Sequence, residues 1–341
     1  MNTATKAAMN TAANTAANTE SPVFRTGMIA IVGRPNVGKS TLLNAIVGSH
    51  VSITSRKPQT TRNRVLGVLT RPDAQYVFVD TPGLQHRHRN LMTRRMNSGV
   101  ASALHGVDAV VMVVDAHGWQ EGDDAVLRLL PKPRPVPVVA DDAAAAPGTD
   151  ADGAPPSPPS RVILALSKTD ALRDKAQLLP RIADAAARYP FAAIVPVSAA
   201  RGWQIDDLLA GLRGLLPEGM PLFEADQITD RSVRFLAAEL VREQVFRLMG
   251  DELPYGMAVT IERWAESPGR AVIDALILVE RESQRAMVIG AGGRKLREIG
   301  VKARAGIERL LEKPVFLQTH VRVQPGWNRD ARALDQLGIE S

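Results

Sequence analysis

Short apolar runs rich in valine and isoleucine recur through the first two thirds of the chain. Runs of this length between polar clusters are typical of strands buried on both faces of a sheet. They lie at residues 28–32, 65–69, 76–79, 109–114, 162–166 and 193–197. Segments of helical length separate most of them, at residues 39–47, 91–104, 174–188 and 205–216. This alternation predicts an α/β domain with a mostly parallel sheet over residues 26–220.

The pattern of apolar positions changes beyond residue 221. Apolar residues at helical spacing mark residues 233–248, and alternating apolar and polar residues predict a strand at 257–262. The remaining expected elements are a strand at 271–280, helices on both sides of a glycine-rich block at 287–295, and a last strand at 315–323. The order α-β-β-α-α-β predicts a smaller α+β domain over residues 226–324, followed by a C-terminal tail, 325–341.

Two segments lack the pattern of strands and helices that marks the two domains. One is the N-terminal segment, residues 1–25, whose first twenty residues repeat Asn-Thr-Ala units and have neither the apolar core of a secretion signal nor the arginines of a transit peptide. We expect a disordered tail there. Residues 131–160 contain nine prolines among thirty residues, which predicts an exposed loop. Because the strand pattern continues on both sides of this segment, we interpret it as an insertion within the first domain.

Composition narrows the class of protein. The 341 residues are 45% hydrophobic and 23% charged, as in globular proteins, and no apolar run reaches the roughly eighteen residues of a membrane-spanning helix. The absence of cysteine excludes disulfides and thiolate chemistry and fits a reducing cytoplasm. The net charge is +6, and much of the excess falls in residues 56–71 and 281–304. Each basic stretch is either a solvated surface or a nucleic-acid contact.

The sequence GRPNVGKS at residues 33–40 lies between a predicted strand and a predicted helix. In that context, backbone N–H groups wrap phosphates, Lys39 reaches the terminal phosphates, and the Ser40 hydroxyl ligates magnesium. The candidate phosphate-binding residues are Gly33, Arg34, Pro35, Asn36, Val37, Gly38, Lys39, Ser40 and Thr41.

A second motif, DTPGL, follows the strand predicted at 76–79. Asp80 would hold magnesium through water, and the Gly83 N–H would contact a γ-phosphate. The nucleotide-site candidates here are Asp80, Thr81, Pro82, Gly83 and Leu84. Leu84 follows the glycine of this motif and Gln85 comes one position later, so the residue that would activate water for attack on a phosphate stays open.

Two further motifs at strand ends predict that the base is guanine. They supply the candidates Ser167, Lys168, Thr169, Asp170, Ser198 and Ala199. A carboxylate such as Asp170 accepts hydrogen bonds from N1–H and the 2-amino group of guanine, which adenine cannot match. The Ala199 N–H would meet the guanine carbonyl, and the Lys168 stem would pack on the base. These four motifs, in this order, resemble the translation-factor class of GTPases.

That resemblance implies roles for three more positions. Ser167 stands where these GTPases usually have asparagine, so we expect a weaker bridge between base and phosphate loop. A threonine of QTTR, residues 59–62, would ligate magnesium only when GTP is bound. The family's TTR pattern favours Thr61, with Thr60 as the alternative. Asn36 is similar to an asparagine that holds a monovalent cation in potassium-dependent relatives; the alternative is a loop residue without a cation.

The glycine-rich block of the second domain has the pattern GxxG at residues 290–293. Between two helices and before basic residues, it resembles the loop of a bacterial-type KH domain, where RNA backbone approaches glycine closely. The candidate RNA contacts are Ile289, Gly290, Ala291, Gly292, Gly293, Arg294 and Lys295. The alternative is a turn that merely connects two helices.

Taken together, GRPNVGKS, TTR, DTPGL, ITDRSVRF, ELPY, LILVER and VIG resemble the Era family of bacterial ribosome-assembly GTPases, over residues 26–327. The resemblance implies a monomeric GTPase that uses Mg²⁺, binds small-subunit ribosomal RNA near its 3′ end and acts in assembly of the small ribosomal subunit. It leaves open K⁺ as a second ion and peripheral attachment to the cell membrane. Two alternatives remain: a phosphate-loop ATPase or nucleotide kinase, and an RNA-binding scaffold with negligible hydrolysis.

Overall fold

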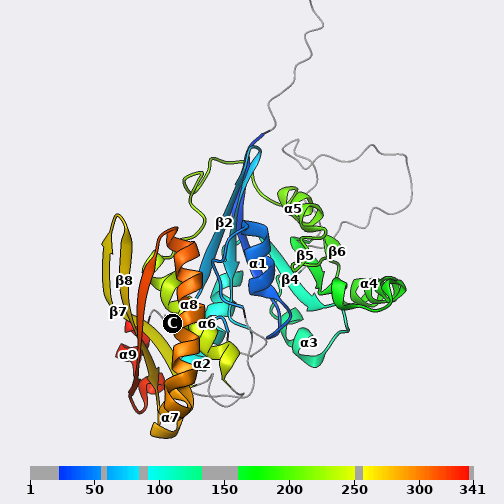
Figure 1. The fold of residues 1–341 in the computed structure, drawn as a ribbon. Coiled ribbons are helices and arrows are strands. Elements are labelled where there is room, and N and C mark those ends of the chain that lie inside the picture. The colour runs from blue at the N-terminus through cyan, green and yellow to red at the C-terminus, as the bar shows by residue number, and fades with distance from the viewer. Residues whose placement is uncertain (1–22, 55–59, 84–90, 133–159, 250–255, 338–341) are drawn as a thin grey trace, which may run out of the picture.

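The computed structural model describes residues 23–54, 60–83, 91–132, 160–249 and 256–337, which form two domains side by side (Figure 1). The first domain is built on a six-stranded sheet in the order β2-β3-β1-β4-β5-β6. Its strands are β1 (Arg25–Val32), β2 (Val65–Arg71), β3 (Ala74–Asp80), β4 (Ala109–Asp115), β5 (Val162–Ser167) and β6 (Ala193–Pro196). Among these described strands only the β2–β3 pair is antiparallel, so the predicted mostly parallel sheet is confirmed.

Helices cover both faces of this sheet. They are α1 (Lys39–Val47), α2 (Leu91–Leu104), α3 (Glu121–Leu127), α4 (Leu178–Arg188) and α5 (Ile205–Arg213). Alternate residues of β1 enter different cores: Ile29 and Ile31 pack in a cluster with residues of α1 and α5, whereas Ala30 and Val32 pack with residues of α3 and α4. The parallel order brings the carboxyl ends of β1, β4 and β5 to one edge, where the candidate motifs lie.

The second domain has a three-stranded sheet with helices packed on one face. In chain order its elements are α6 (Val233–Leu248), β7 (Met257–Ser267), β8 (Arg270–Val279), α7 (Glu282–Ile289), α8 (Arg294–Leu311) and β9 (Val315–Val323). The sheet order is β7-β8-β9, with β7 antiparallel and β9 parallel to β8. This is the small α+β fold that the sequence predicts, and one apolar cluster joins α6, α8 and the sheet.

The described residues after Val323 fold instead of forming only a tail. A turn of 3₁₀ helix, η5 (Trp327–Arg329), precedes α9 (Ala331–Gln336). Trp327 and Leu334 are fully buried in a cluster that also contains Met92 of α2 and Leu278 of β8. This segment therefore joins the two domains. The sequence analysis predicted a C-terminal tail at 325–341 and did not predict this contact.

The proline-rich insertion lies between two strands of one sheet, because β4 before it and β5 after it pair in parallel. Residues 133–159 themselves lie outside the described ranges.

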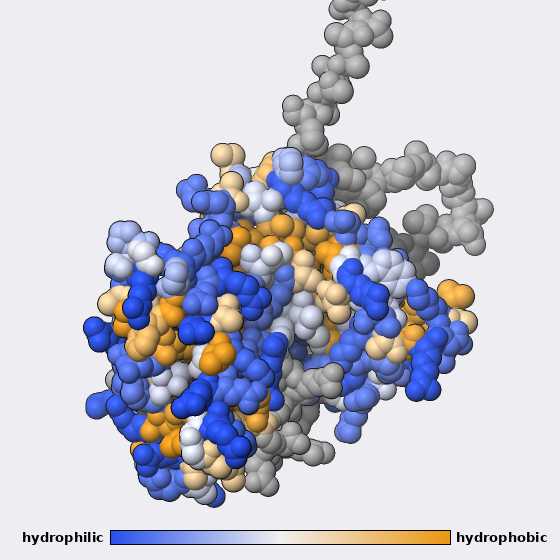
Figure 2. Space-filling view, viewed as in Figure 1, coloured by the Kyte–Doolittle hydropathy of each residue, from blue (hydrophilic) through white to orange (hydrophobic). Residues whose placement is uncertain are grey.

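Figure 2 shows apolar side chains gathered over β2 and α1, where the surface is hollowed between the two domains. In the part of the chain that the structure describes, no helix is long and apolar enough to cross a bilayer.

Candidate functional site

The phosphate loop, residues 33–38, connects β1 to α1. A Cβ atom on Gly33 would stand 2.5 Å from the carbonyl oxygen of Val113, so the loop approaches β4 more closely than any side chain permits. Asn36 and Gly38 have φ angles of 66° and 101°. Gly38 is the N-cap of α1 and has no side chain to cap it, which leaves the first N–H groups of the helix available to phosphate.

Lys39 lies across the inside of this loop. Its Nζ atom donates hydrogen bonds of 3.0 Å to the carbonyls of Gly33 and Arg34, and only 6% of the residue is exposed. Burial lowers the pKa of Lys39 to about 8, although nearby Asp80 favours the charged form. An anion in the loop would favour the charged form of the amine further, which suits a residue that binds phosphate.

The three candidate magnesium residues meet at one point. The Ser40 hydroxyl donates to Asp80 Oδ2 at 2.8 Å and lies 2.7 Å from Thr61 Oγ1, which is itself 3.3 Å from Asp80. Ser52 also donates to Asp80 Oδ2, at 2.8 Å. Asp80 is completely buried, and its Oδ1 atom has no hydrogen-bond partner among the residues that the structure describes. Burial raises the pKa of Asp80. A buried carboxylate beside three hydroxyls fits a hard cation such as Mg²⁺.

Of the two threonine candidates, it is Thr61 whose hydroxyl joins this oxygen cluster. Thr60 points its carbonyl oxygen toward the second domain, where it accepts from Arg242. The turn after Asp80 is equally close to the phosphate loop, because a Cβ on Gly83 would stand 2.9 Å from the Cα of Pro35. Thr81 anchors that turn by donating to the Ile31 carbonyl at 2.8 Å. Leu84 and Gln85 lie outside the described residues.

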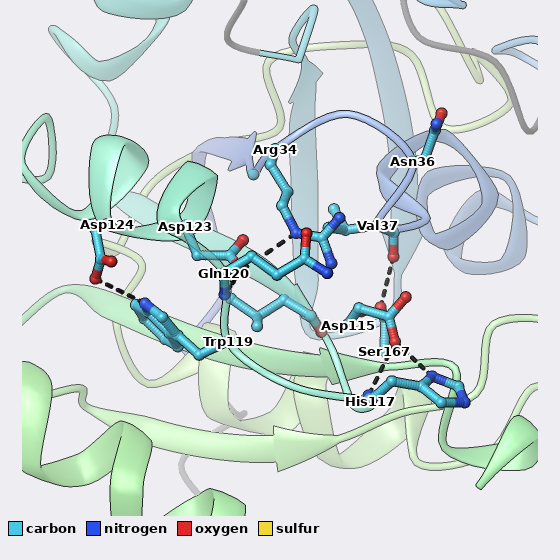
Figure 3. Close-up of polar contacts among 12 residues, drawn as sticks. Arg34, Asn36, Val37, Asp115, His117, Trp119, Gln120, Asp123, Asp124 and Ser167 are labelled. Atoms are coloured by element: carbon cyan, nitrogen blue, oxygen red, sulfur yellow. Dashed lines mark hydrogen bonds and ion pairs between the residues drawn. The ribbon is translucent and has the colours of Figure 1, made fainter.

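The serine in place of asparagine still reaches the phosphate loop. The Ser167 hydroxyl donates to the carbonyl of Val37 at 2.5 Å and lies 3.1 Å from that of Val114 (Figure 3). A second connection runs beside it, because Lys168 Nζ donates to the Asn36 carbonyl at 2.7 Å. The structure thus holds the expected base-binding loop against the phosphate loop by two bonds.

Asp115, at the carboxyl end of β4, is a site residue that the sequence analysis missed. It accepts from Lys168 Nζ at 2.8 Å and lies 2.7 Å from His117 Nδ1. Burial alone would raise its pKa, but hydrogen bonds from Lys168 and His117 hold the pKa of Asp115 at about 2. Its position at the end of a parallel strand, level with the other motifs, was the available signal.

The residues expected to read the base are held in place by hydrogen bonds to the segment that follows β6. Ser198, fully buried, donates its hydroxyl to Asp170 Oδ1 at 2.6 Å, while Asp170 itself is exposed. Thr169 donates its hydroxyl to the Val197 carbonyl at 3.0 Å. The Asp170 carboxylate is therefore oriented by protein on one side and open on the other, with Ala199 next in the chain.

Two phosphate-loop side chains point elsewhere. Arg34 turns toward α3, where its Nε donates to the buried Asp123 at 3.2 Å, so it offers only its backbone to the loop (Figure 3). Burial raises the pKa of Asp123. In Figure 3 the side chain of Asn36 projects away from the other labelled residues.

The glycine loop of the second domain lies between α7 and α8. Its φ angles are 69° at Gly290, 57° at Gly292 and 74° at Gly293. A Cβ on Gly290 would stand 2.8 Å from the Lys295 side chain, whereas Cβ atoms on Gly292 and Gly293 would meet nothing within 4 Å. Arg294 and Lys295 are exposed beside it. The loop therefore presents open backbone next to two cations, a suitable surface for a phosphodiester chain.

A phosphate loop beside the oxygen cluster of Ser40, Thr61 and Asp80, joined to a small α+β domain with an open glycine loop, is the arrangement expected of a phosphate-loop GTPase with an RNA-binding domain. The family described as "50S ribosome-binding GTPase" matches residues 28–141, and the family described as "KH domain" matches residues 252–328. GTPase Era of Bordetella avium is 50% identical over 320 residues, which cover 94% of this chain and 99% of that protein. GTPase Era of Xanthomonas axonopodis is 48% identical over 316 residues, covering 93% and 97%.

Two solved structures extend this similarity to the whole fold. Era in complex with MgGDPNP and nucleotides 1506–1542 of 16S ribosomal RNA matches with a TM-score of 0.82 and 35% identity, over 93% of this chain and 100% of that one. An Era variant from Aquifex aeolicus bound to GDP and AlF4⁻ matches with a TM-score of 0.80 and 35% identity, over the same shares. The chain belongs to the Era family of GTPases, which confirms the resemblance found in the sequence.

Proposed function

We propose that this chain binds GTP with Mg²⁺ in its first domain, residues 26–220, and hydrolyses it to GDP and phosphate. We further propose that its KH domain, residues 226–324, binds small-subunit ribosomal RNA near the 3′ end, and that the protein acts in assembly of the small ribosomal subunit. The observation that carries the proposal is the oxygen cluster of Ser40, Thr61 and Asp80 at the start of α1. A related protein of the same family binds both classes of ligand in one complex.

The residues of the first domain divide the work of binding GTP. Lys39 and the backbone N–H groups that the phosphate loop offers bind the phosphates, while Ser40, Thr61 and Asp80 would hold Mg²⁺, which would supply positive charge beside the phosphates. The Gly83 N–H contacts the γ-phosphate from the opposite side. Asp170 reads the guanine edge, and Lys168, oriented by Asp115, covers the face of the base.

We propose K⁺ as a second ion, held by the Asn36 side chain. Asn36 has a left-handed backbone, and its main-chain carbonyl is engaged by Lys168 at 2.7 Å. The side-chain amide oxygen of Asn36 is the group that would hold this cation. A cation there would add positive charge near the phosphates, where charge develops during hydrolysis.

In the cell, we propose a monomer that works in the cytoplasm, where ribosomal subunits assemble, with a peripheral contact to the inner membrane. The partners are the small ribosomal subunit and its ribosomal RNA. In the second domain the RNA contacts are Ile289, Gly290, Ala291, Gly292, Gly293, Arg294 and Lys295.

The test is GTP turnover with and without purified small ribosomal subunits, in potassium and in sodium. We expect turnover above the Lys39→Ala background, faster in potassium, and Asn36→Ala should remove the difference between the salts without weakening GDP binding. Equal rates in both salts would remove the second ion from the proposal. Turnover no higher than the Lys39→Ala background would favour a scaffold, and displacement of labelled GDP by ADP would favour an ATPase or kinase.

A further inference from the structure

The loop that carries Thr61 is attached to both domains within three residues. Thr61 places its hydroxyl 2.7 Å from that of Ser40, within the oxygen cluster that would hold Mg²⁺. The neighbours on either side turn to the second domain: the Thr60 carbonyl accepts from Arg242 of α6, and Arg62 Nη1 donates to the Met257 carbonyl at the start of β7. A shift of the second domain therefore pulls directly on the residues that flank Thr61.

Arg62 is enclosed by the second domain although it belongs to the first. Only 5% of the residue is exposed. Its guanidinium carbon lies 5.7 Å from the ring centroid of Phe246 in α6 and 6.0 Å from that of Trp327 in η5. Burial, with a smaller effect of Arg242, lowers the pKa of Arg62 to about 9. A guanidinium between two aromatic rings, out of water, has a well-defined position.

Arg242 contacts the same loop from the other side, and we call the contacts of Arg62 and Arg242 together the clamp. It is 3% exposed, donates from Nε to Glu239 at 2.6 Å, and lies 5.1 Å from the same Phe246 ring. Its Nη2 atom donates to the Thr60 carbonyl. The second domain thus contacts the backbone before Thr61 and the side chain after it, with one aromatic ring shared between the two arginines.

A second attachment lies six residues before Thr60. Glu243, next to Arg242 and 2% exposed, accepts from the Thr54 N–H at 3.0 Å and from the Thr54 hydroxyl at 2.9 Å. His50 Nε2 lies 3.1 Å from its other oxygen. The described residues on both sides of 55–59 are therefore fastened to the same helix, α6.

We propose that Arg62 is a positioning residue for GTP, through which the second domain holds Thr61 at the magnesium cluster. The inference rests on the proposed function and on the expectation from the sequence that Thr61 ligates Mg²⁺ only when GTP is bound. Ordering a loop costs conformational entropy, and the clamp meets part of that cost before the nucleotide arrives. By linkage, GTP must stabilise the docked arrangement of the domains by the same factor.

The rival explanation is an interface that only stabilises the fold. It predicts that loss of Arg62 lowers affinity for GTP and GDP alike, or for neither. The positioning role predicts a selective loss, because GDP has no γ-phosphate to bring Thr61 into the magnesium shell. The ratio of the two affinities therefore separates the explanations.

The experiment compares the full-length wild-type protein with Arg62→Met, which keeps the length of the side chain and removes its charge. With Mg²⁺ present, we expect affinity for GDPNP to fall about tenfold, a typical coupling between sites, and affinity for GDP to stay unchanged. Arg62→Lys keeps the charge but not the planar guanidinium, so its affinity for GDPNP should lie between those of the wild type and Arg62→Met. Asp335→Ala is the matched control: it removes a 2.6 Å ion pair between α9 and Arg95 of α2 that touches none of residues 60–62.

A double-mutant cycle with Thr61→Ala closes the test. If Arg62 acts through Thr61, then Arg62→Met should cause no further loss of GDPNP affinity in the Thr61→Ala protein. Additive losses, or an equal loss for GDP, would overturn the proposal. If Arg62→Met does not fold by circular dichroism, Arg62→Lys carries the same comparison. Failure of the wild type to bind GDPNP would instead overturn the proposed function.

Discussion

The molecule contains two glycine loops that precede helices, and their surroundings differ. In the phosphate loop, Gly33 is pressed against β4 and Lys39 is almost completely buried. In the loop of the second domain, Gly292 and Gly293 face open space, and the cations beside them are exposed. Both loops contain residues with positive φ angles, a backbone conformation in which glycine leaves room for a close ligand.

The difference corresponds to the size of the ligand. A nucleotide is a small molecule that can be enclosed, so burial strengthens each contact with its phosphates. An RNA chain continues in both directions and needs a surface that remains open at its ends. Enclosure of the first loop also removes Lys39 from water, whereas the second loop keeps its cations solvated and therefore sensitive to salt.

The largest test of the enclosed loop is Lys39→Ala. We expect GTP affinity to fall on the order of a thousandfold, because the buried amine is the charge closest to the phosphates. Binding of labelled nucleotide measures this loss. Affinity for RNA should stay at the wild-type value, which also shows that the variant is folded. Retained GTP affinity would mean that the enclosed loop is no nucleotide site.

The next largest effect is expected at the opposite end of the nucleotide. Asp170→Asn replaces an acceptor by a donor that faces the donors of guanine, so GTP affinity should fall about a hundredfold. Xanthine nucleotides should gain affinity, because they offer an acceptor at the same place. Competition between GTP and XTP for the labelled site measures both changes. A variant that keeps GTP and gains nothing for XTP would contradict the guanine assignment.

Two carboxylates in the open loop should have an intermediate effect. Combining Ala291→Asp with Gly292→Asp should lower RNA affinity about thirtyfold, or about 2 kcal/mol, through repulsion and loss of close approach. Aspartate tolerates the φ of 57° at Gly292 better than most residues, so the fold should survive. The probe is a single-stranded oligonucleotide that matches the 3′ end of small-subunit ribosomal RNA. Wild-type affinity in a folded variant would mean that the loop is only a turn, and GTP turnover is the control that should not change.

The smallest effect should come from the flanking cations. Replacing Arg294 and Lys295 by alanine should lower RNA affinity about fivefold and reduce the slope of log affinity against log salt by roughly 1.4, for two contacts to single-stranded RNA. Titrations at several salt concentrations give the slope. An unchanged slope would place these cations away from the RNA phosphates. The second glycine loop would then contact phosphate through its backbone alone.

The sequence allowed the meeting of the candidate nucleotide-site motifs at one edge of the sheet to be predicted, because these motifs lie at the ends of parallel strands. The helices expected at 39–47 and 91–104 have those bounds in the structure. The phosphate loop, Asp80 and Asp170 follow strands whose order brings them to one edge. Local pattern was sufficient there because each residue's role depends on its own strand end.

The clamp around Arg62 could not be predicted in this way. Arg62 lies in the basic stretch 56–71, which the sequence analysis left between a solvated surface and a nucleic-acid contact, and it is neither. Its carbonyl partner, Met257, is 195 residues away, and its rings come from α6 and η5. No periodicity marks a cation that is buried by another domain. The six residues of α9 were missed for a related reason, since so short a helix gives no repeating apolar pattern.

The cluster around Trp327 has a consequence for how the protein is made. Met92 and Met96 of α2 are synthesised early, but Trp327 and Leu334, which pack with them, leave the ribosome more than two hundred residues later. Chains grow from the N-terminus, and domains tend to fold as they appear. The first domain therefore exists for a time with the apolar side of α2 uncovered. The junction between the domains closes only when residues 327–334 have been translated, so a nascent chain that stops before them cannot complete it.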